Sequence, residues 1–215
     1  MRRTLNAIGQ RSGAPILLVL LPGACMTAND FVTAGFFEAV AQRRLPLDLL
    51  AVDLDLAAIS GGTALPALQT EILAPARTEG YRKVWLGGIS LGGLLALCHV
   101  ADTPGAADGL CLIAPYPGSR LTTNAIASSG GLAGWTPDAR QLGDPEFRMW
   151  RWLQEPPAGF PAFVGWGSGD RFASGMQQIA ACFPPQTACC VPGGHDWLAW
   201  RTLWDHFLDR GTLAD

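Results

Sequence analysis

The sequence predicts an α/β protein, a three-layer α/β/α sandwich built around a mainly parallel sheet of about six strands. Six short apolar runs alternate with segments of helical periodicity, which is typical of parallel strands joined by helical crossovers. Most of the runs are continuously apolar, as expected of strands buried on both faces. Right-handed crossovers would bring the carboxyl ends of these strands to one edge of the sheet, where sites in such folds form.

The apolar runs and the periodic segments define the expected elements. Strand 16–21 stops at Pro22-Gly23, strand 110–114 stops at Pro115, and Gly80 is the expected end of one helix. The expected strands cover residues 16–21, 47–54, 84–88, 110–114, 162–166 and 187–191, and the expected helices cover residues 31–43, 65–79, 91–101, 145–153, 174–182 and 197–210.

The 215 residues suit one domain, 1–215, with a short lid-like insertion around 118–159. The insertion is rich in Gly and Pro, breaks the strand–helix rhythm and contains one expected helix. It is too short and too poor in aliphatic periodicity to form a core of its own. We therefore expect it to lie over the carboxyl edge of the sheet.

Composition excludes several classes of partner. The net charge is −3 and only 15% of residues are charged, so we expect no nucleic-acid partner. No apolar run approaches the length of about 20 residues that spans a bilayer, so we expect no stable membrane insertion. The oligomeric state stays open, a homodimer included.

The six cysteines point to a reducing compartment. Most lie inside apolar strand-like or helical runs, as small buried hydrophobic residues do. No Cys-x-x-Cys or Cys/His cluster suggests a metal. Met1-Arg2-Arg3 followed by an apolar run and Cys25 imitates a lipoprotein signal, but the run is short and also fits a strand. We therefore expect a cytoplasmic protein.

The segment Gly88-Ile89-Ser90-Leu91-Gly92 has the form of a nucleophile elbow. In such a turn a serine sits in a strained conformation between a strand and a helix, so small residues are needed two positions before and after it. The five residues alone would also fit an ordinary glycine-rich turn. The apolar run before them and the helical run after them favour the elbow.

A serine hydroxyl needs a general base that a carboxylate holds in place. His195 follows the last expected strand in a Gly-rich loop, and Asp170 follows the strand before it. Both therefore belong to the carboxyl edge, although Asp170 would also suit a turn or a helix cap. His99 and His206 lie along helices, where we expect structural or surface roles.

Stabilisation of an oxyanion needs two backbone N–H groups. One is expected from Leu91, the residue after the serine, and the other from the turn after the first strand. In that turn Gly23 permits a sharp bend, so Ala24, or else Cys25, would offer its N–H.

These motifs resemble those of a small α/β-hydrolase superfamily member of the serine esterase or thioesterase kind. The resemblance runs from Leu17 to Leu208 and rests on the turn 21–24, the elbow, and the loops around Asp170 and His195. It implies that Ser90, Asp170 and His195 are nucleophile, acid and base, and that Leu91 and Ala24 form the oxyanion hole. Two features depart from the family: Pro-Gly replaces His-Gly in the first turn, and the early antiparallel strands have no room before residue 16.

The expected activity is hydrolysis of a small or medium carboxylic ester or thioester through an acyl-enzyme, with neither metal nor organic cofactor. An acyltransferase, a C–C hydrolase or a lyase could use the same scaffold, and a non-catalytic binding protein could keep it. Candidate pocket residues are Cys25, Met26, Trp135 and Trp197. For the tryptophans of the insertion, packing within the lid is the alternative.

Overall fold

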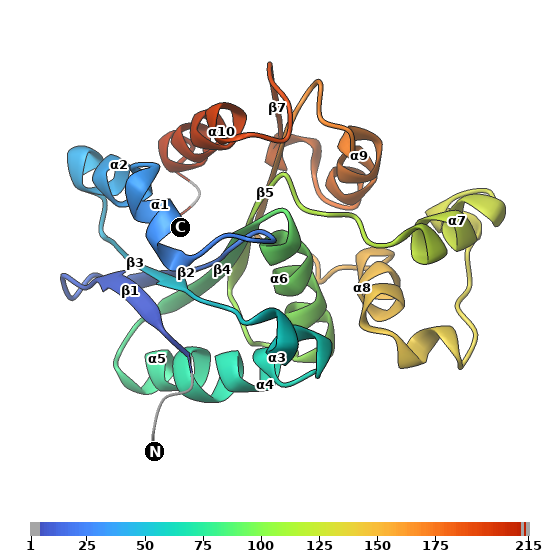
Figure 1. The fold of residues 1–215 in the computed structure, drawn as a ribbon, viewed down its shortest axis with the longest axis horizontal. Helices are drawn as coiled ribbons and strands as arrows, with labels where there is room; N and C mark the ends of the chain where they lie inside the picture. The colour runs from blue at the N-terminus through green and yellow to red at the C-terminus, as the bar shows by residue number, and fades with distance from the viewer. Residues whose placement is uncertain (1–4, 212, 214–215) are drawn as a thin grey trace.

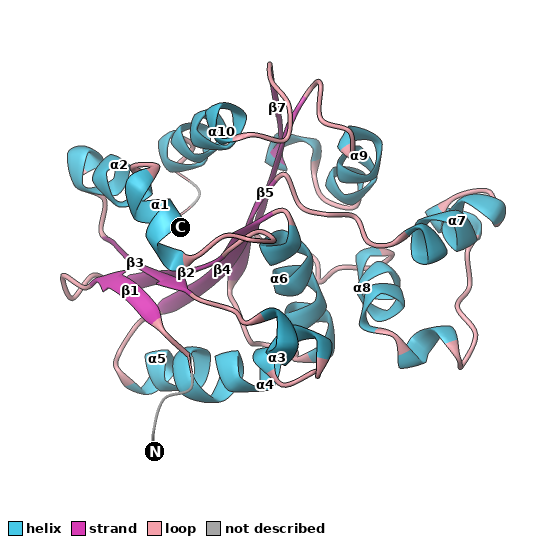
Figure 2. Cartoon of the chain, viewed as in Figure 1, coloured by secondary structure: helices cyan, strands magenta, loops and turns pink. Residues whose placement is uncertain are grey.

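The computed structural model describes residues 5–211 and 213, and it contains a seven-stranded sheet with helices on both faces (Figures 1 and 2). The strand order is β1-β3-β2-β4-β5-β6-β7. From β3 to β7 every pair of neighbouring strands is parallel. This confirms the expected fold class. The strands are β1 (Ala7–Gln10), β2 (Ile16–Leu21), β3 (Leu47–Val52), β4 (Lys83–Ile89), β5 (Gly109–Ile113), β6 (Ala162–Gly167) and β7 (Ala188–Val191).

Strand β1 corrects the sequence prediction, which had no strand before residue 16. Residues Ala7–Gln10 pair antiparallel with β3 at the edge of the sheet. All four residues are exposed, so this strand has no continuous apolar run to reveal it. The sheet therefore has seven strands rather than about six.

Helices cover the two faces of the sheet in separate groups (Figure 1). Helices α1, α2 and α10 lie on one face, and α5, α6 and α9 lie on the other. The α-helices are α1 (Ala28–Thr33), α2 (Phe36–Arg43), α3 (Leu56–Ser60), α4 (Ala64–Leu68), α5 (Ala74–Thr78), α6 (Leu91–Asp102), α7 (Arg120–Ser128), α8 (Pro145–Leu153), α9 (Ala173–Ala181) and α10 (Trp197–Asp209). None of the helices in the described part of the chain is long and apolar enough to cross a membrane.

Most expected helices are present, with local differences. The helix expected over 31–43 is two helices, because Gly35 adopts a positive φ of 77° and breaks the run. The helix expected over 65–79 contains a π-helical turn, η1 (Gln69–Leu73), between α4 and α5. Helices α3 and α7 were not predicted. Each begins at a polar cap residue, Asp55 or Ser119, rather than at an apolar pattern.

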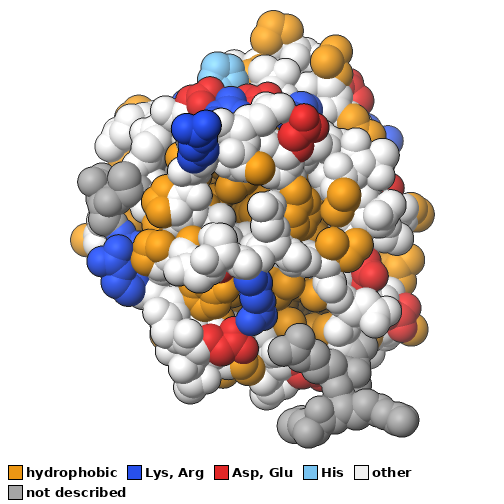
Figure 3. Space-filling model, turned by 90° about the vertical axis from the view of Figure 1, so that its left-hand side faces the viewer, with side chains coloured by type: hydrophobic (Ala, Val, Ile, Leu, Met, Phe, Trp, Pro, Cys, Tyr) orange, Lys and Arg blue, Asp and Glu red, His pale blue; other side chains and the backbone are white. Residues whose placement is uncertain are grey.

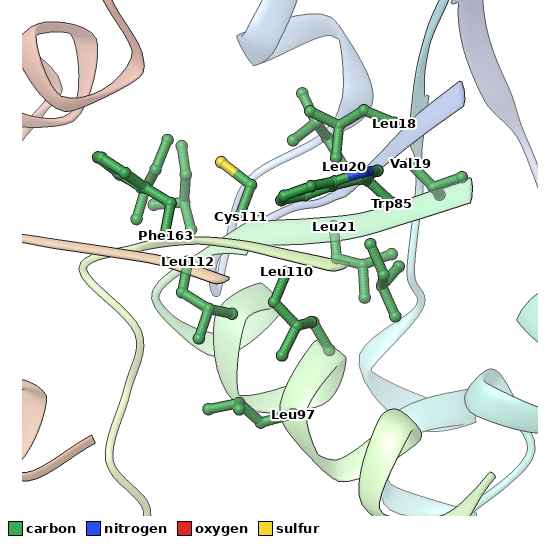
Figure 4. Close-up of a cluster of buried hydrophobic side chains, with 14 of the residues drawn as sticks. Leu18, Val19, Leu20, Leu21, Trp85, Leu97, Leu110, Cys111, Leu112 and Phe163 are labelled. Carbon is green, nitrogen blue, oxygen red and sulfur yellow. The ribbon is translucent and has the colours of Figure 1, made fainter. Parts of the chain in front are cut away.

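Side chains of β5 alternate between the two faces of the sheet, and the hydrophobic core lies on both faces (Figure 4). Leu110 and Leu112 point toward Leu97 of α6, whereas Cys111 points to the opposite side. Phe163 and Trp85 lie on that opposite side too. These side chains are all almost fully buried, so helix layers pack on both faces of the sheet.

The surface carries few charges, in keeping with the composition. On the side of the molecule that lies at the left of Figure 1, charged groups are scattered among hydrophobic and uncharged atoms (Figure 3).

All six cysteines are free, and three of them are buried: Cys98, Cys111 and Cys189.

The segment between β5 and β6 carries α7 and α8, and α8 packs against α6 (Figure 1). Trp150 of α8 is buried, and its Nε1–H donates to the Pro117 carbonyl oxygen over 2.9 Å. That bond joins the helix to the chain leaving β5. The insertion is therefore anchored through α8 beside the helix that follows Ser90.

Candidate active site

Ser90 occupies a sharp turn between β4 and α6. Its φ is 53°, a region that non-glycine residues seldom adopt. Two hydrogen bonds from outside α6 hold this backbone: the Ser90 N–H donates to the Ile113 carbonyl over 3.1 Å, and the Tyr116 N–H donates to the Ser90 carbonyl over 2.9 Å. The chain leaving β5 thus fixes the strained turn.

The glycines on either side of Ser90 are required by space. A Cβ atom on Gly88 would collide with the backbone of Gly92. A Cβ atom on Gly92 would in turn collide with the backbone of Leu21 in β2. Backbone atoms cannot shift without a large energetic cost. The sharp turn from β4 into α6 therefore depends on both glycines.

The structure brings the three predicted side chains together at the carboxyl edge. His195 Nε2 lies 2.8 Å from Ser90 Oγ, although the residues are 105 positions apart in the chain. On the other side of the ring, His195 Nδ1 lies 2.6 Å from Asp170 Oδ2. The Asp170 side chain is 0% exposed, and its Oδ1 accepts a bond from the Phe172 N–H over 2.9 Å. Both carboxylate oxygens are therefore engaged, which fixes the orientation of the imidazole.

The loops that carry Asp170 and His195 are joined directly to each other. The Gly169 N–H donates to the Gly193 carbonyl over 2.8 Å, and the Ser168 N–H donates to Val191 at the same distance. His195 and Asp170 are thus positioned as one unit.

Two aromatic rings flank the imidazole, and the sequence did not identify either. The ring centroids of Phe172 and Trp200 lie 5.6 Å and 5.1 Å from that of His195, both nearly perpendicular to it. Phe172 comes two residues after Asp170, and this closeness in sequence is the one feature that could have placed it near the site. Trp200 belongs to α10, and its contact with His195 depends on how α10 follows the loop.

The turn after β2 lies beside Ser90. A Cβ atom on Gly23 would stand 3.6 Å from the Ser90 Cβ. The turn is closed by the Met26 N–H, which donates to the Gly23 carbonyl over 3.1 Å. Within the described residues the N–H groups of Ala24, Cys25 and Leu91 meet no acceptor, so each can donate to a ligand.

Two of the four candidate pocket residues belong to this turn. Cys25 and Met26 line a hollow of about 310 Å³ together with Leu91. Trp197 packs instead among the rings of Phe31, Phe36 and Trp200.

The fourth candidate, Trp135, lies inside the insertion. It is buried and stacks on Phe147 at a centroid distance of 5.8 Å. It faces a separate hollow that contains none of the residues beside Ser90.

The other two histidines stand apart from this arrangement. His99 is buried on α6, and its Nε2 lies 2.8 Å from Gln69 Oε1. Burial lowers the pKa of His99, an effect that the nearby Asp102 partly opposes. His206 is exposed on α10. In residues 5–211 and 213, no three His, Cys, Asp or Glu side chains group as metal ligands would.

Comparison with solved structures identifies the fold. The chain superposes with a TM-score of 0.66 on MGS-MChE2, an alpha/beta hydrolase enzyme from the metagenome of lagoon sediments of Mar Chica, Morocco, at 16% identity, covering 100% of this chain and 97% of that one. Against FphF, a fluorophosphonate-binding serine hydrolase of Staphylococcus aureus, the TM-score is 0.66 at 10% identity, with 97% and 98% covered. Against a ferulic acid esterase it is 0.64 at 13% identity, with 99% and 98% covered.

No family model and no curated protein matches the sequence itself. The likeness is therefore one of structure. It shows that the chain has the α/β-hydrolase fold, as the motifs around Ser90, Asp170 and His195 had suggested.

Proposed function

From the α/β-hydrolase fold of this chain and the hydrogen bonds that link Ser90, His195 and Asp170, we propose that it is a serine hydrolase of small or medium carboxylic esters or thioesters. The observation that carries the proposal is the unbroken path from the serine hydroxyl through the imidazole to a buried carboxylate, with bonds of 2.8 Å and 2.6 Å. A serine hydroxyl with such partners becomes a nucleophile near neutral pH. The esterase and serine hydrolases of the same fold support the reaction class.

The mechanism follows from the roles that this geometry allows. Asp170 accepts a hydrogen bond from the Nδ1–H of His195, so the other ring nitrogen, Nε2, can act as a proton acceptor. When Ser90 Oγ attacks the substrate carbonyl, Nε2 takes the hydroxyl proton of the serine. The imidazolium then gives that proton to the departing alcohol or thiol, and an acyl-enzyme remains. Water attacks the acyl group with His195 again as base, which releases the acid and restores the serine.

The oxyanion of each tetrahedral intermediate needs donors that are already in place. The Leu91 N–H at the start of α6 is one, and the Ala24 N–H in the turn after β2 is the other. Both are free of acceptors in the described part of the chain. Loss of a single such donor typically costs about 3 kcal/mol of transition-state stabilisation.

Replacement of the nucleophile is the direct test. Ser90→Ala should lower kcat for a short-chain aryl ester by roughly 10⁴-fold to 10⁶-fold, because no group remains to form the acyl-enzyme. A fluorophosphonate probe should label the wild type on the peptide that contains Ser90 and should leave the variant unlabelled. Mass spectrometry of the digest measures the labelling, and kinetics measure the turnover.

Ser129→Ala is the matched control, because Ser129 is exposed in the insertion and outside the site. It should keep wild-type turnover and labelling. A wild type that neither reacts with the probe nor hydrolyses any ester or thioester would remove the proposal in favour of a binding protein. Labelling together with acyl transfer to an added alcohol instead of water would indicate a transferase.

A further inference from the structure

We infer that the acyl chain of the substrate lies in an apolar groove along α6 that starts beside Leu91. The groove has a volume of about 720 Å³ and lies between the segment 59–70 and the start of α8. The inference rests on the proposed function and adds to it the preferred class of substrate, an ester with an unbranched acyl chain of medium length.

The groove adjoins the hollow at the turn after β2. Leu91 and Ile59 line both the hollow of about 310 Å³, which contains Gly23 and Met26, and the groove. A carbonyl carbon bonded to Ser90 would lie next to the Leu91 N–H. A chain attached to that carbon can therefore pass Ile59 and enter the groove.

The wall formed by α6 suits a straight hydrocarbon chain. Leu91, Leu94, Leu95 and Cys98 occupy positions i, i+3, i+4 and i+7, so they form one apolar stripe along the helix. From Leu91 to the end of the groove at Asp102 the helix rises about 16 Å. An apolar stripe that follows one side of a helix over this length suits an extended chain better than a branched or bulky acid.

The two cationic or basic side chains at the far end of the groove, Arg148 and His99, already have hydrogen-bond partners in its lining. Arg148 binds Asp102 through two bonds of 2.6 Å and 2.7 Å, and His99 lies against Gln69. The guanidinium is therefore already bound to a carboxylate, and the imidazole Nε2 is already bound to an amide oxygen. A chain that ends in a methyl group therefore fits this groove better than a chain that ends in an acid.

The test measures how kcat/KM for p-nitrophenyl esters depends on acyl length, from acetate to decanoate at concentrations below micelle formation. Each methylene that enters the groove should raise kcat/KM about 4-fold until binding of the chain is complete. Ile59→Trp would fill the junction between hollow and groove, and should lower the ratio of decanoate to acetate kcat/KM by about ten-fold or more. Ile8→Trp is the matched control, because Ile8 is 39% exposed on the edge strand β1, and should keep the wild-type ratio.

Each outcome decides the matter. If the wild type hydrolyses acetate but gains nothing with chain length, or if Ile59→Trp keeps the wild-type ratio, the groove does not hold the acyl chain, while the proposed function survives. If no ester is cleaved and the fluorophosphonate probe does not react, the proposed function and this inference fail together. Should Ile59→Trp fail to fold by circular dichroism, Leu65→Trp on the same wall takes its place, with the same expected loss.

Discussion

Backbone strain in this protein gathers at the candidate site. Cys25, Ser90 and Ala114 all have positive φ, at 61°, 53° and 45°, and they belong to the turns after β2, β4 and β5. Among non-glycine residues that the structure describes, only Arg44 shares this conformation. Such conformations persist where surrounding structure holds them. The Ser90 N–H donates to Ile113 in β5, and the Ala114 N–H donates to Gly165 in β6.

A second effect at the residue scale concerns His99. Burial lowers the pKa of His99 in the folded protein, whereas the unfolded chain titrates near its usual value of about 6.5. The unfolded state therefore binds more protons below that pH. The contribution of neutral His99 to stability is full above about pH 6.5 and is lost as the pH falls toward the folded pKa.

We therefore expect the wild type to lose more unfolding free energy between about pH 7.5 and about pH 5 than His99→Gln does. Urea unfolding at each pH measures the difference. His206→Gln replaces an exposed histidine and should follow the wild-type slope. Equal slopes for wild type and His99→Gln would contradict the expectation.

At the scale of elements, Glu146 joins the two helices of the insertion. Its Oε2 accepts bonds from the Ser119 N–H and the Ser119 hydroxyl, both at 2.8 Å, and from the Thr122 hydroxyl at 2.7 Å. Ser119 is the N-cap of α7, and Thr122 is buried. One carboxylate on the first turn of α8 thus holds the start of α7.

Glu146→Ala should free the start of α7, because the buried Thr122 hydroxyl and the Ser119 N–H lose their acceptor at a cost of roughly 1 to 3 kcal/mol. Trypsin should then cleave after the exposed Arg120 faster than it does in the wild type. Limited proteolysis followed by mass spectrometry measures the rate. Glu155→Ala, at an exposed position just after α8, should leave the cleavage rate unchanged. An unchanged cleavage rate in Glu146→Ala would mean that the Glu146 carboxylate does not hold the start of α7.

At the scale of the whole molecule, Trp204 connects the last helix to an early one. It is 0% exposed, stacks on Phe36 with centroids 4.8 Å apart, and donates its Nε1–H to the Phe36 carbonyl over 3.1 Å. Phe36 begins α2, so the contact ties residues 168 positions apart. The helices on this face of the sheet are locked together by it.

Trp204→Ala should lower the free energy of unfolding by about 3 to 5 kcal/mol, because a large cavity replaces the indole between α10 and α2. Urea unfolding measures the change. Leu198→Ala, on the same helix but 81% exposed, should change stability by less than about 0.5 kcal/mol. A similar small loss in both variants would mean that the indole is not a principal link.

The apolar runs and the turns that end them sufficed to predict the parallel sheet, the elbow at Ser90 and the placement of Asp170 and His195 on one edge. These features depend on short-range patterns: continuous apolar strands, small residues around a sharp turn, and polar residues directly after a strand. Features of this kind can be predicted from the sequence, because each depends on residues that are close together in the chain.

Contacts between distant segments were decided only in the folded molecule. The exposed strand β1 exists because it pairs with β3, and the rings of Phe172 and Trp200 flank His195 because two loops and α10 meet there. The groove along α6 likewise needs three separate segments to form its walls. No short-range sequence pattern encodes these contacts between distant segments, because they depend on how the loops close and how the helices pack.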